Sequence, residues 1–166
     1  MINGNITGIR RSLLDEMEMM YESDMETLRH EFVSTELMDA LAALSGRVNR
    51  EISVYIARDG MVMDVSVGRH DRVGLPDLRV RRGARRLTGI RCIHTHPNAS
   101  GELSSVDLAT LMHARFDAMA AIGVVQGKAV DLYAAYLTGQ AQPESEMYGP
   151  FDPLRPLPGK GFETSM

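Results

Sequence analysis

The chain contains a single cysteine, Cys92, so no disulfide can form within it. No secretory signal pattern opens the sequence, and no apolar run is long enough to span a membrane. These absences together predict a cytoplasmic protein that makes no membrane contact. We expect Cys92 to be a buried packing residue, with a redox or metal-ligand role as the alternative.

Aromatic residues are also scarce, at 5% of the 166 residues, although 44% of the chain is hydrophobic. A normal core is therefore expected from Leu, Val, Ile, Ala and Met, and the length suits one domain with an appendage at each end. The net charge of −4 makes nucleic-acid binding by this domain alone an unfavoured function. Nothing in the chain matches a Walker A phosphate-binding loop.

The most informative segment that is present runs His94-Thr-His96-Pro97-Asn-Ala-Ser-Gly-Glu-Leu-Ser104-Ser-Val-Asp107. The apolar residues before it predict a buried strand over 87–96. Residues i and i+2 of a strand point to the same face, so His94 and His96 should face one way and Thr95 the other. Pro97 has no N–H to donate to a continuing strand ladder, so we expect the strand to end there.

A helix should begin after the loop that follows Pro97, with Ser104 or Ser105 as its N-cap and Asp107 in its first turn. Two imidazoles and a carboxylate would then converge from a strand end and a helix start. Catalytic zinc sites typically have three nitrogen or oxygen ligands and a water. The pattern therefore predicts a Zn²⁺ site formed by His94, His96 and Asp107.

A carboxylate near such a metal, but not bound to it, can act as a general base. Glu51 opens an apolar run at 51–58 that we predict to be the first strand of the sheet. It is far from His94 in the sequence, so only the fold can bring the two together. The alternative is that Glu51 is an ordinary solvated glutamate, and that Ser104 serves only as a helix cap.

Over roughly residues 34–137 the chain resembles the JAMM (MPN-type) metalloprotease family, and its loop at 97–104 is similar to the RadC-like branch. The resemblance implies an α/β (α+β) fold, a JAMM/MPN-like (cytidine-deaminase-like) mixed β-sheet flanked by helices. It also implies hydrolysis of peptide or isopeptide bonds, with Glu51 activating the zinc-bound water and Ser104 stabilising the oxyanion. The positions that carry the resemblance are Glu51, His94, His96, Pro97, Ser104 and Asp107.

A narrower resemblance concerns residues 1–10 and 90–97, which are similar to an N-terminal extension of some bacterial HflX-type GTPases. It implies that the chain is a fragment of a longer protein with a ribosome-associated GTPase module. The alternative function is then a non-catalytic regulatory or docking module that associates with the ribosome or with the GTPase module.

Three regions are expected: an N-terminal helical appendage at 1–33, the JAMM/MPN-like domain at 34–138, and a Pro/Gly-rich linker or tail at 139–166. Apolar residues near helical spacing predict a helix over 5–30, interrupted at Ser23 and Asp24. Its apolar stripe would either dock the helix on the domain or form a homodimer surface.

Within the domain, Ser34 or Thr35 should cap a helix from Glu36 to Ser45 that Gly46 ends. A tight hairpin turn is expected at 58–60. The remaining expected elements are strands at 51–58, 61–67, 87–96, 118–125 and 129–137, and a helix at 105–117.

The segment 68–86 is the least regular part of the domain, and five of its seven arginines are clustered at 79–86. These form either a solvated loop or a contact for an acidic partner, a phosphate or RNA. We assign no chemistry to His70 or His113. The clustered arginines are Arg79, Arg81, Arg82, Arg85 and Arg86.

Overall fold

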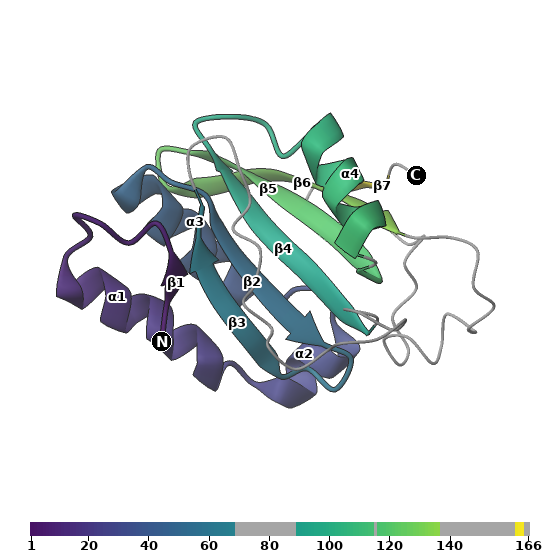
Figure 1. The fold of residues 1–166 in the computed structure, drawn as a ribbon, viewed down its shortest axis with the longest axis horizontal. Helices are drawn as coiled ribbons and strands as arrows, with labels where there is room; N and C mark the ends of the chain where they lie inside the picture. The colour runs from purple at the N-terminus through teal and green to yellow at the C-terminus, as the bar shows by residue number, and fades with distance from the viewer. Residues whose placement is uncertain (69–88, 115, 137–161, 165–166) are drawn as a thin grey trace.

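The structure is a computed structural model, and it describes residues 1–68, 89–114, 116–136 and 162–164. Within these residues, seven strands form one mixed sheet in the order β1-β3-β2-β4-β5-β6-β7 (Figure 1). The predicted mixed α/β class is therefore correct. The arginine cluster, His70 and most of the predicted tail lie outside the described residues.

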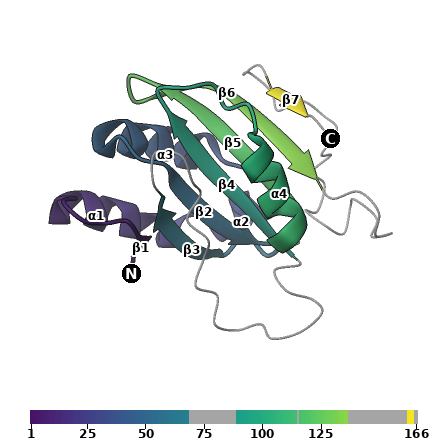
Figure 2. The ribbon, with the colours of Figure 1, turned by 45° about the horizontal axis from the view of Figure 1, so that its top comes forward.

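Helices cover both faces of this sheet (Figures 1 and 2). The N-terminal helices and α3 cover one face, and α4 covers the other. None of the described helices is long and apolar enough to cross a membrane. The helices are α1 (Arg11–Glu18), the 3-10 helix η1 (Met19–Glu22), α2 (Met25–His30), α3 (Thr35–Val48) and α4 (Ser105–Ala114).

The N-terminal helix begins later than predicted. Residues 3–4 form strand β1 (Asn3–Gly4), which pairs with β3, and the chain becomes helical only at Arg11. The predicted interruption is confirmed, since Asp24 caps α2 by accepting the N–H of Glu26 at 3.1 Å. Pairing of the first residues with a sheet edge is a tertiary contact that helical periodicity does not reveal.

The apolar stripe of this segment is buried against the sheet. Leu13, Met17 and Leu28 belong to the same core cluster as Ile52 and Val54 of the sheet. The stripe therefore docks the helices on the domain. A homodimer remains a prediction.

A buried arginine fastens the N-terminal segment to the sheet. Arg91 of β4 is 0% exposed, and its guanidinium donates to backbone carbonyls at the end of α2. Positive charge is favourable at a helix C-terminus, where carbonyls lack intrahelical partners. The accepting carbonyls are those of Leu28, Glu31 and Phe32, with Ala57 at 3.4 Å.

Helix α3 differs from its prediction at one end. Ser34 is the N-cap, as expected, and accepts the N–H of Leu37 at 3.1 Å. Gly46 does not end the helix, which continues to Val48 and stops at Asn49 in the left-handed conformation (φ 50°). A Cβ on Gly46 would lie 2.5 Å from the Cα of Gly127, so this glycine serves close packing instead.

The central strands are arranged so that β4 lies between an antiparallel and a parallel neighbour. Strand β4 includes Pro97, one residue beyond the predicted end. The crossover from β4 to β5 passes through α4, which ends by Ala114, earlier than the predicted 117. The strands are β2 (Ile52–Ala57), β3 (Val62–Val67), β4 (Ile90–Pro97), β5 (Ala118–Val125), β6 (Lys128–Tyr136) and β7 (Phe162–Thr164).

Asp117 explains why the chain leaves the helix before this residue. Its carboxylate accepts the N–H of Gly89 at 3.0 Å and pairs with Arg58 at 2.8 Å, while its own N–H donates to the carbonyl of Ile90.

Strand β7 is a further difference from the prediction, because it adds three residues of the predicted linker to the sheet beside β6.

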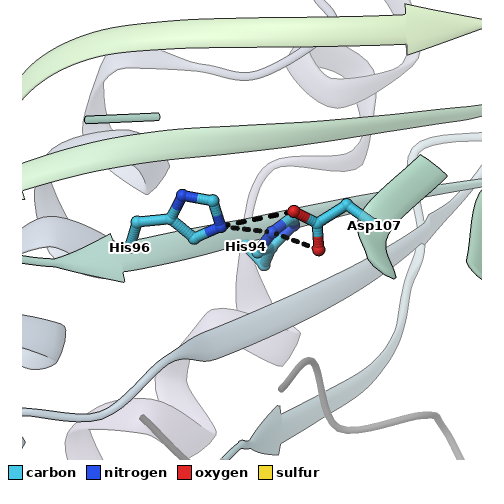
Figure 3. A group of neighbouring side chains, drawn as sticks. All are labelled: His94, His96 and Asp107. Carbon is cyan, nitrogen blue, oxygen red and sulfur yellow. Dashed lines mark hydrogen bonds and ion pairs between the residues drawn. The ribbon is translucent and has the colours of Figure 1, made fainter. Parts of the chain in front are cut away.

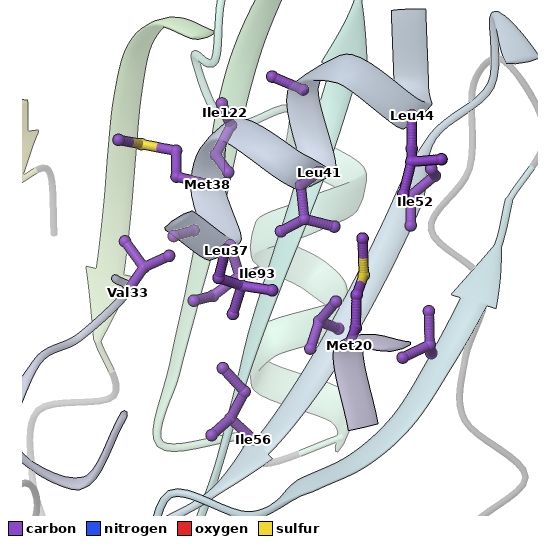
Figure 4. Close-up of a cluster of buried hydrophobic side chains, with 14 of the residues drawn as sticks. Met20, Val33, Leu37, Met38, Leu41, Leu44, Ile52, Ile56, Ile93 and Ile122 are labelled. Carbon is purple, nitrogen blue, oxygen red and sulfur yellow. The ribbon is translucent and has the colours of Figure 1, made fainter. Parts of the chain in front are cut away.

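Among the described residues the core consists of two clusters, one on each face of the sheet. The larger cluster lies between the sheet and the N-terminal helices and α3 (Figure 4). The smaller one lies under α4 and includes Tyr55, Cys92 and Met119. Cys92 is fully buried, as expected, and burial raises the pKa of its thiol so that it stays neutral.

Candidate metal centre

The end of strand β4 and the first turn of helix α4 bring three side chains together (Figure 3). The Nε2 atoms of His94 and His96 are 3.0 Å apart. Asp107 places Oδ1 3.2 Å from Nε2 of His94 and Oδ2 3.5 Å from Nε2 of His96. Within the described part of the chain, this is the only group of three or more His, Cys, Asp or Glu side chains arranged to hold a metal ion.

Thr95 points away from this group, as strand alternation predicts. Its hydroxyl donates to Oγ of Ser45 on α3 at 2.8 Å and accepts the N–H of Ile52 at 2.9 Å. These buried bonds tie the end of β4 to the helix behind the sheet and to the start of β2. They fix the strand from which both histidines project.

Asp107 is held by the cap of its own helix. The hydroxyl of Ser104 accepts the N–H of Asp107 at 3.1 Å, while Oδ2 of Asp107 accepts the N–H and the hydroxyl of Ser104, each at 2.7 Å. This reciprocal arrangement is a capping box. It identifies Ser104, and not Ser105, as the N-cap, and it orients the carboxylate toward the histidines.

The protonation of His96 is determined by its second nitrogen. Nδ1 of His96 lies 3.0 Å from the carbonyl of Ser100, which can only accept, so Nδ1 carries the proton. In the neutral imidazole the lone pair of Nε2 is then available to a metal ion, and in the charged form Nε2–H points to Asp107. A metal-binding histidine typically donates its other N–H in this way.

The loop that carries Ser100 is held by a residue that sequence reasoning did not identify. Asp131 on β6 accepts the N–H of Gly101 at 2.6 Å and the hydroxyl of Ser100 at 3.2 Å. No signal in the sequence places Asp131 here, because its contact with the loop depends on the pairing of β5 with β6.

Electrostatics at the centre differ between the three groups. Burial lowers the pKa of His94, and the nearby Asp107 carboxylate offsets this effect only in part. Burial also opposes the charged form of His96, but hydrogen bonds to Asp107 and Ser100 outweigh it and raise the pKa of His96. For Asp107, burial is outweighed by hydrogen bonds from both histidines, which hold its pKa well below the usual range.

Two imidazole nitrogens and a carboxylate oxygen are a donor set that divalent metal ions such as zinc accept. In a tetrahedral site with ligand distances of about 2.0–2.1 Å, neighbouring ligand atoms are about 3.3 Å apart. The two histidine Nε2 atoms are 3.0 Å apart, and the three ligand atoms, one from each residue, lie within 4.8 Å of one another.

Glu51 lies beside this centre and is only 6% exposed, so the alternative of a solvated glutamate is wrong. The antiparallel register pairs Ser53 with His94, so Glu51, two residues before Ser53, lies at the same end of the strand pair as His96. The charge of Glu51 also raises the pKa of His96. The fold therefore brings this carboxylate to the edge of the metal-ligand group.

The remaining histidine in the described part of this domain has a local partner. His113 is exposed, and its Nδ1 lies 2.7 Å from the carbonyl of Ala109 within α4. It takes no part in the centre, as expected.

Comparisons with models of protein families, with curated proteins and with solved structures found no match to this chain.

Proposed function

We propose that this protein is a zinc-dependent hydrolase of peptide or isopeptide bonds with a JAMM-type site. The observation that carries the proposal is the convergence of His94, His96 and Asp107, whose acceptor atoms lie within 4.8 Å of one another. Acceptor atoms this close repel one another, and a cation bound between them would remove that repulsion. The agreement of the six motif positions with the JAMM/MPN pattern supports the hydrolytic chemistry.

A zinc ion bound to these three residues would lower the pKa of a water molecule to about 7 and polarise the scissile carbonyl. Glu51 takes one proton from the attacking water as the new C–O bond forms. It then delivers that proton to the leaving nitrogen as the C–N bond breaks. Its buried position at the start of β2 keeps the carboxylate beside His96 during both transfers.

Ser104 makes a structural contact in addition to the oxyanion-stabilising role that its motif position implies. Its single hydroxyl proton is donated to Oδ2 of Asp107, so in this structure Ser104 positions a metal ligand. Donation to an oxyanion requires the hydroxyl to rotate away from Asp107. The N–H of Ser104, which also donates to Oδ2, keeps the carboxylate in place during such a rotation.

The proposal is tested by metal analysis and turnover of the purified chain. We expect about one zinc per chain, lost in the His94→Ala/His96→Ala double variant, and cleavage in a panel of peptide and isopeptide substrates. Glu51→Gln should retain the zinc and lose at least about 100-fold in turnover, because the general base is gone. Glu22→Gln, which changes an exposed glutamate on the other face, is the matched control. Full turnover of Glu51→Gln would contradict the mechanism.

The second candidate function is a non-catalytic docking or regulatory module of a ribosome-associated GTPase, located in the cytoplasm. A groove of about 800 Å³ between the N-terminal helices and α3 favours it, since Met19, Leu37 and Ala40 line it with acidic neighbours. In that case the metal is structural. Zinc bound without turnover on any substrate of the panel would favour this function over hydrolysis.

A further inference from the structure

A second cavity, of about 430 Å³, lies where the start of α1 meets the end of α3. Its walls include Gly8, Arg10 and Ser12 from the N-terminal segment, and Arg47 and Arg50 from the end of α3 and just beyond. Both helices cover the face of the sheet opposite α4. No residue of the candidate metal centre lines this cavity.

The charged side chains that line the cavity are all positive. Three of its lining residues are arginines and none is acidic, although the whole chain has a net charge of −4. Arg47 pairs with Glu16 at 2.5 Å. Within the described ranges, no ion pair joins Arg10 or Arg50 to a carboxylate, so two positive charges there lack a counter-charge.

Arg50 is fixed in its position. Its guanidinium donates to the carbonyl of Asn5 at 2.5 Å and to that of Thr7 at 2.8 Å. These neutral partners anchor the side chain and leave its charge uncompensated. An arginine whose side chain is already ordered in the free protein loses little conformational freedom when it binds an anion.

The helix that begins at the cavity adds to the positive potential. The N-cap of α1 is Arg10, which makes no side-chain capping bond, and the first turn contains no acidic residue. Helix N-termini carry a partial positive charge that acidic side chains or bound anions usually offset. At α1 the arginines and the helix end therefore act together on the same space.

We propose that this cavity binds the phosphoryl group of a small phosphorylated ligand of about mononucleotide size. Guanidinium groups match phosphate oxygens in planar, two-point contacts, and a phosphate monoester carries more charge than one carboxylate. The volume lies near the lower end of the roughly 300–1,000 Å³ typical of small-molecule sites. A compact ligand of that size suits the cavity better than an extended nucleic-acid strand.

Calorimetric titration of the full chain with adenosine 5′-monophosphate tests this, with inorganic phosphate and adenosine as further probes. We expect saturable binding of the monophosphate and none of adenosine, since the phosphoryl group makes the contacts. Equal binding of inorganic phosphate would identify the phosphoryl group alone as the ligand, and weaker binding would show that the nucleoside contributes. Both outcomes support the proposal.

Two variants with the same loss of charge distinguish a site from general attraction. Arg10→Ala removes a guanidinium that lines the cavity, and we expect its Kd to rise about 10-fold. Arg11→Ala removes the neighbouring arginine, which pairs with Asp15 and does not line the cavity, and its Kd should change less than about 2-fold. Arg10 and Arg11 are both exposed, so both variants should fold, and unfolding temperatures will check this.

The proposal is overturned if no probe binds saturably below about 10 mM, a concentration that corresponds to roughly 3 kcal/mol of binding free energy. It is also overturned if Arg10→Ala and Arg11→Ala weaken binding equally, which would indicate unspecific charge attraction. Tighter binding of a single-stranded RNA 12-mer than of the monophosphate, again lost in Arg10→Ala, would replace the small ligand by nucleic acid.

Discussion

Asp131 on β6 accepts the backbone N–H of Gly101 at 2.6 Å, across 30 residues of sequence. This bond holds the loop between β4 and α4 against the sheet, and the same loop presents the Ser100 carbonyl to Nδ1 of His96. Gly123 leaves the space for it, because a Cβ there would lie 2.1 Å from Oδ1 of Asp131. A residue with no ligand atom in the centre thus determines how one ligand is oriented.

Asp131→Ala should weaken zinc binding by about 10–100-fold, because the contact that orients His96 loses its support. Competition with a chelator of known affinity measures the change. Glu102→Ala removes an exposed carboxylate from the same loop and serves as the control. Unchanged zinc affinity in Asp131→Ala would mean that the loop keeps its shape without this bond.

Ser104→Ala should lower the free energy of unfolding by about 1 kcal/mol, since α4 loses its N-cap. Ser105→Ala should change it by less than about 0.5 kcal/mol, because Ser105 makes no capping bond. Urea unfolding of the metal-free proteins measures both values. A larger effect at Ser105 would overturn the assignment of the cap.

Gly46→Ala should destabilise the protein, although alanine usually stabilises a helix by about 1 kcal/mol relative to glycine. The reason is the 2.5 Å separation between the new Cβ and the Cα of Gly127, a backbone atom that cannot turn aside. Thermal unfolding measures the sign of the effect. Ala40→Gly, at an exposed position of α3, is the control and should show the ordinary propensity cost.

Zinc affinity should fall as the pH is lowered through the pKa of His96. The pKa of this imidazole is raised, so a proton competes with the metal for Nε2 at a higher pH than at an ordinary histidine. The lowered pKa values of His94 and Asp107 leave both groups ready to bind over the same range. Zinc titrations between about pH 5.5 and 8 should show a slope near one proton released per ion bound. A pH-independent affinity in that range would contradict this assignment.

Several features of the fold were predictable because they depend on neighbours in the sequence. Helix α3 has Ser34 as its N-cap, the break before α2 is at Asp24, and the strands around the turn at 58–60 follow the apolar pattern. The alternation that separates His94 from Thr95 was predictable for the same reason. The errors at residues 5–10, at Gly46 and at the end of α4 all concern segments whose conformation depends on distant partners.

The sequence by itself determined which side chains are available for a metal centre and that His94 and His96 come from one strand end and Asp107 from one helix start. Spacing along a strand and capping of a helix are local properties, so they can be inferred without a fold. Only the tertiary structure decided that Glu51 is buried beside His96 and that Asp131 holds the loop. Those relations follow from which strands pair and in what register, and pairing is decided by the burial of the whole sheet.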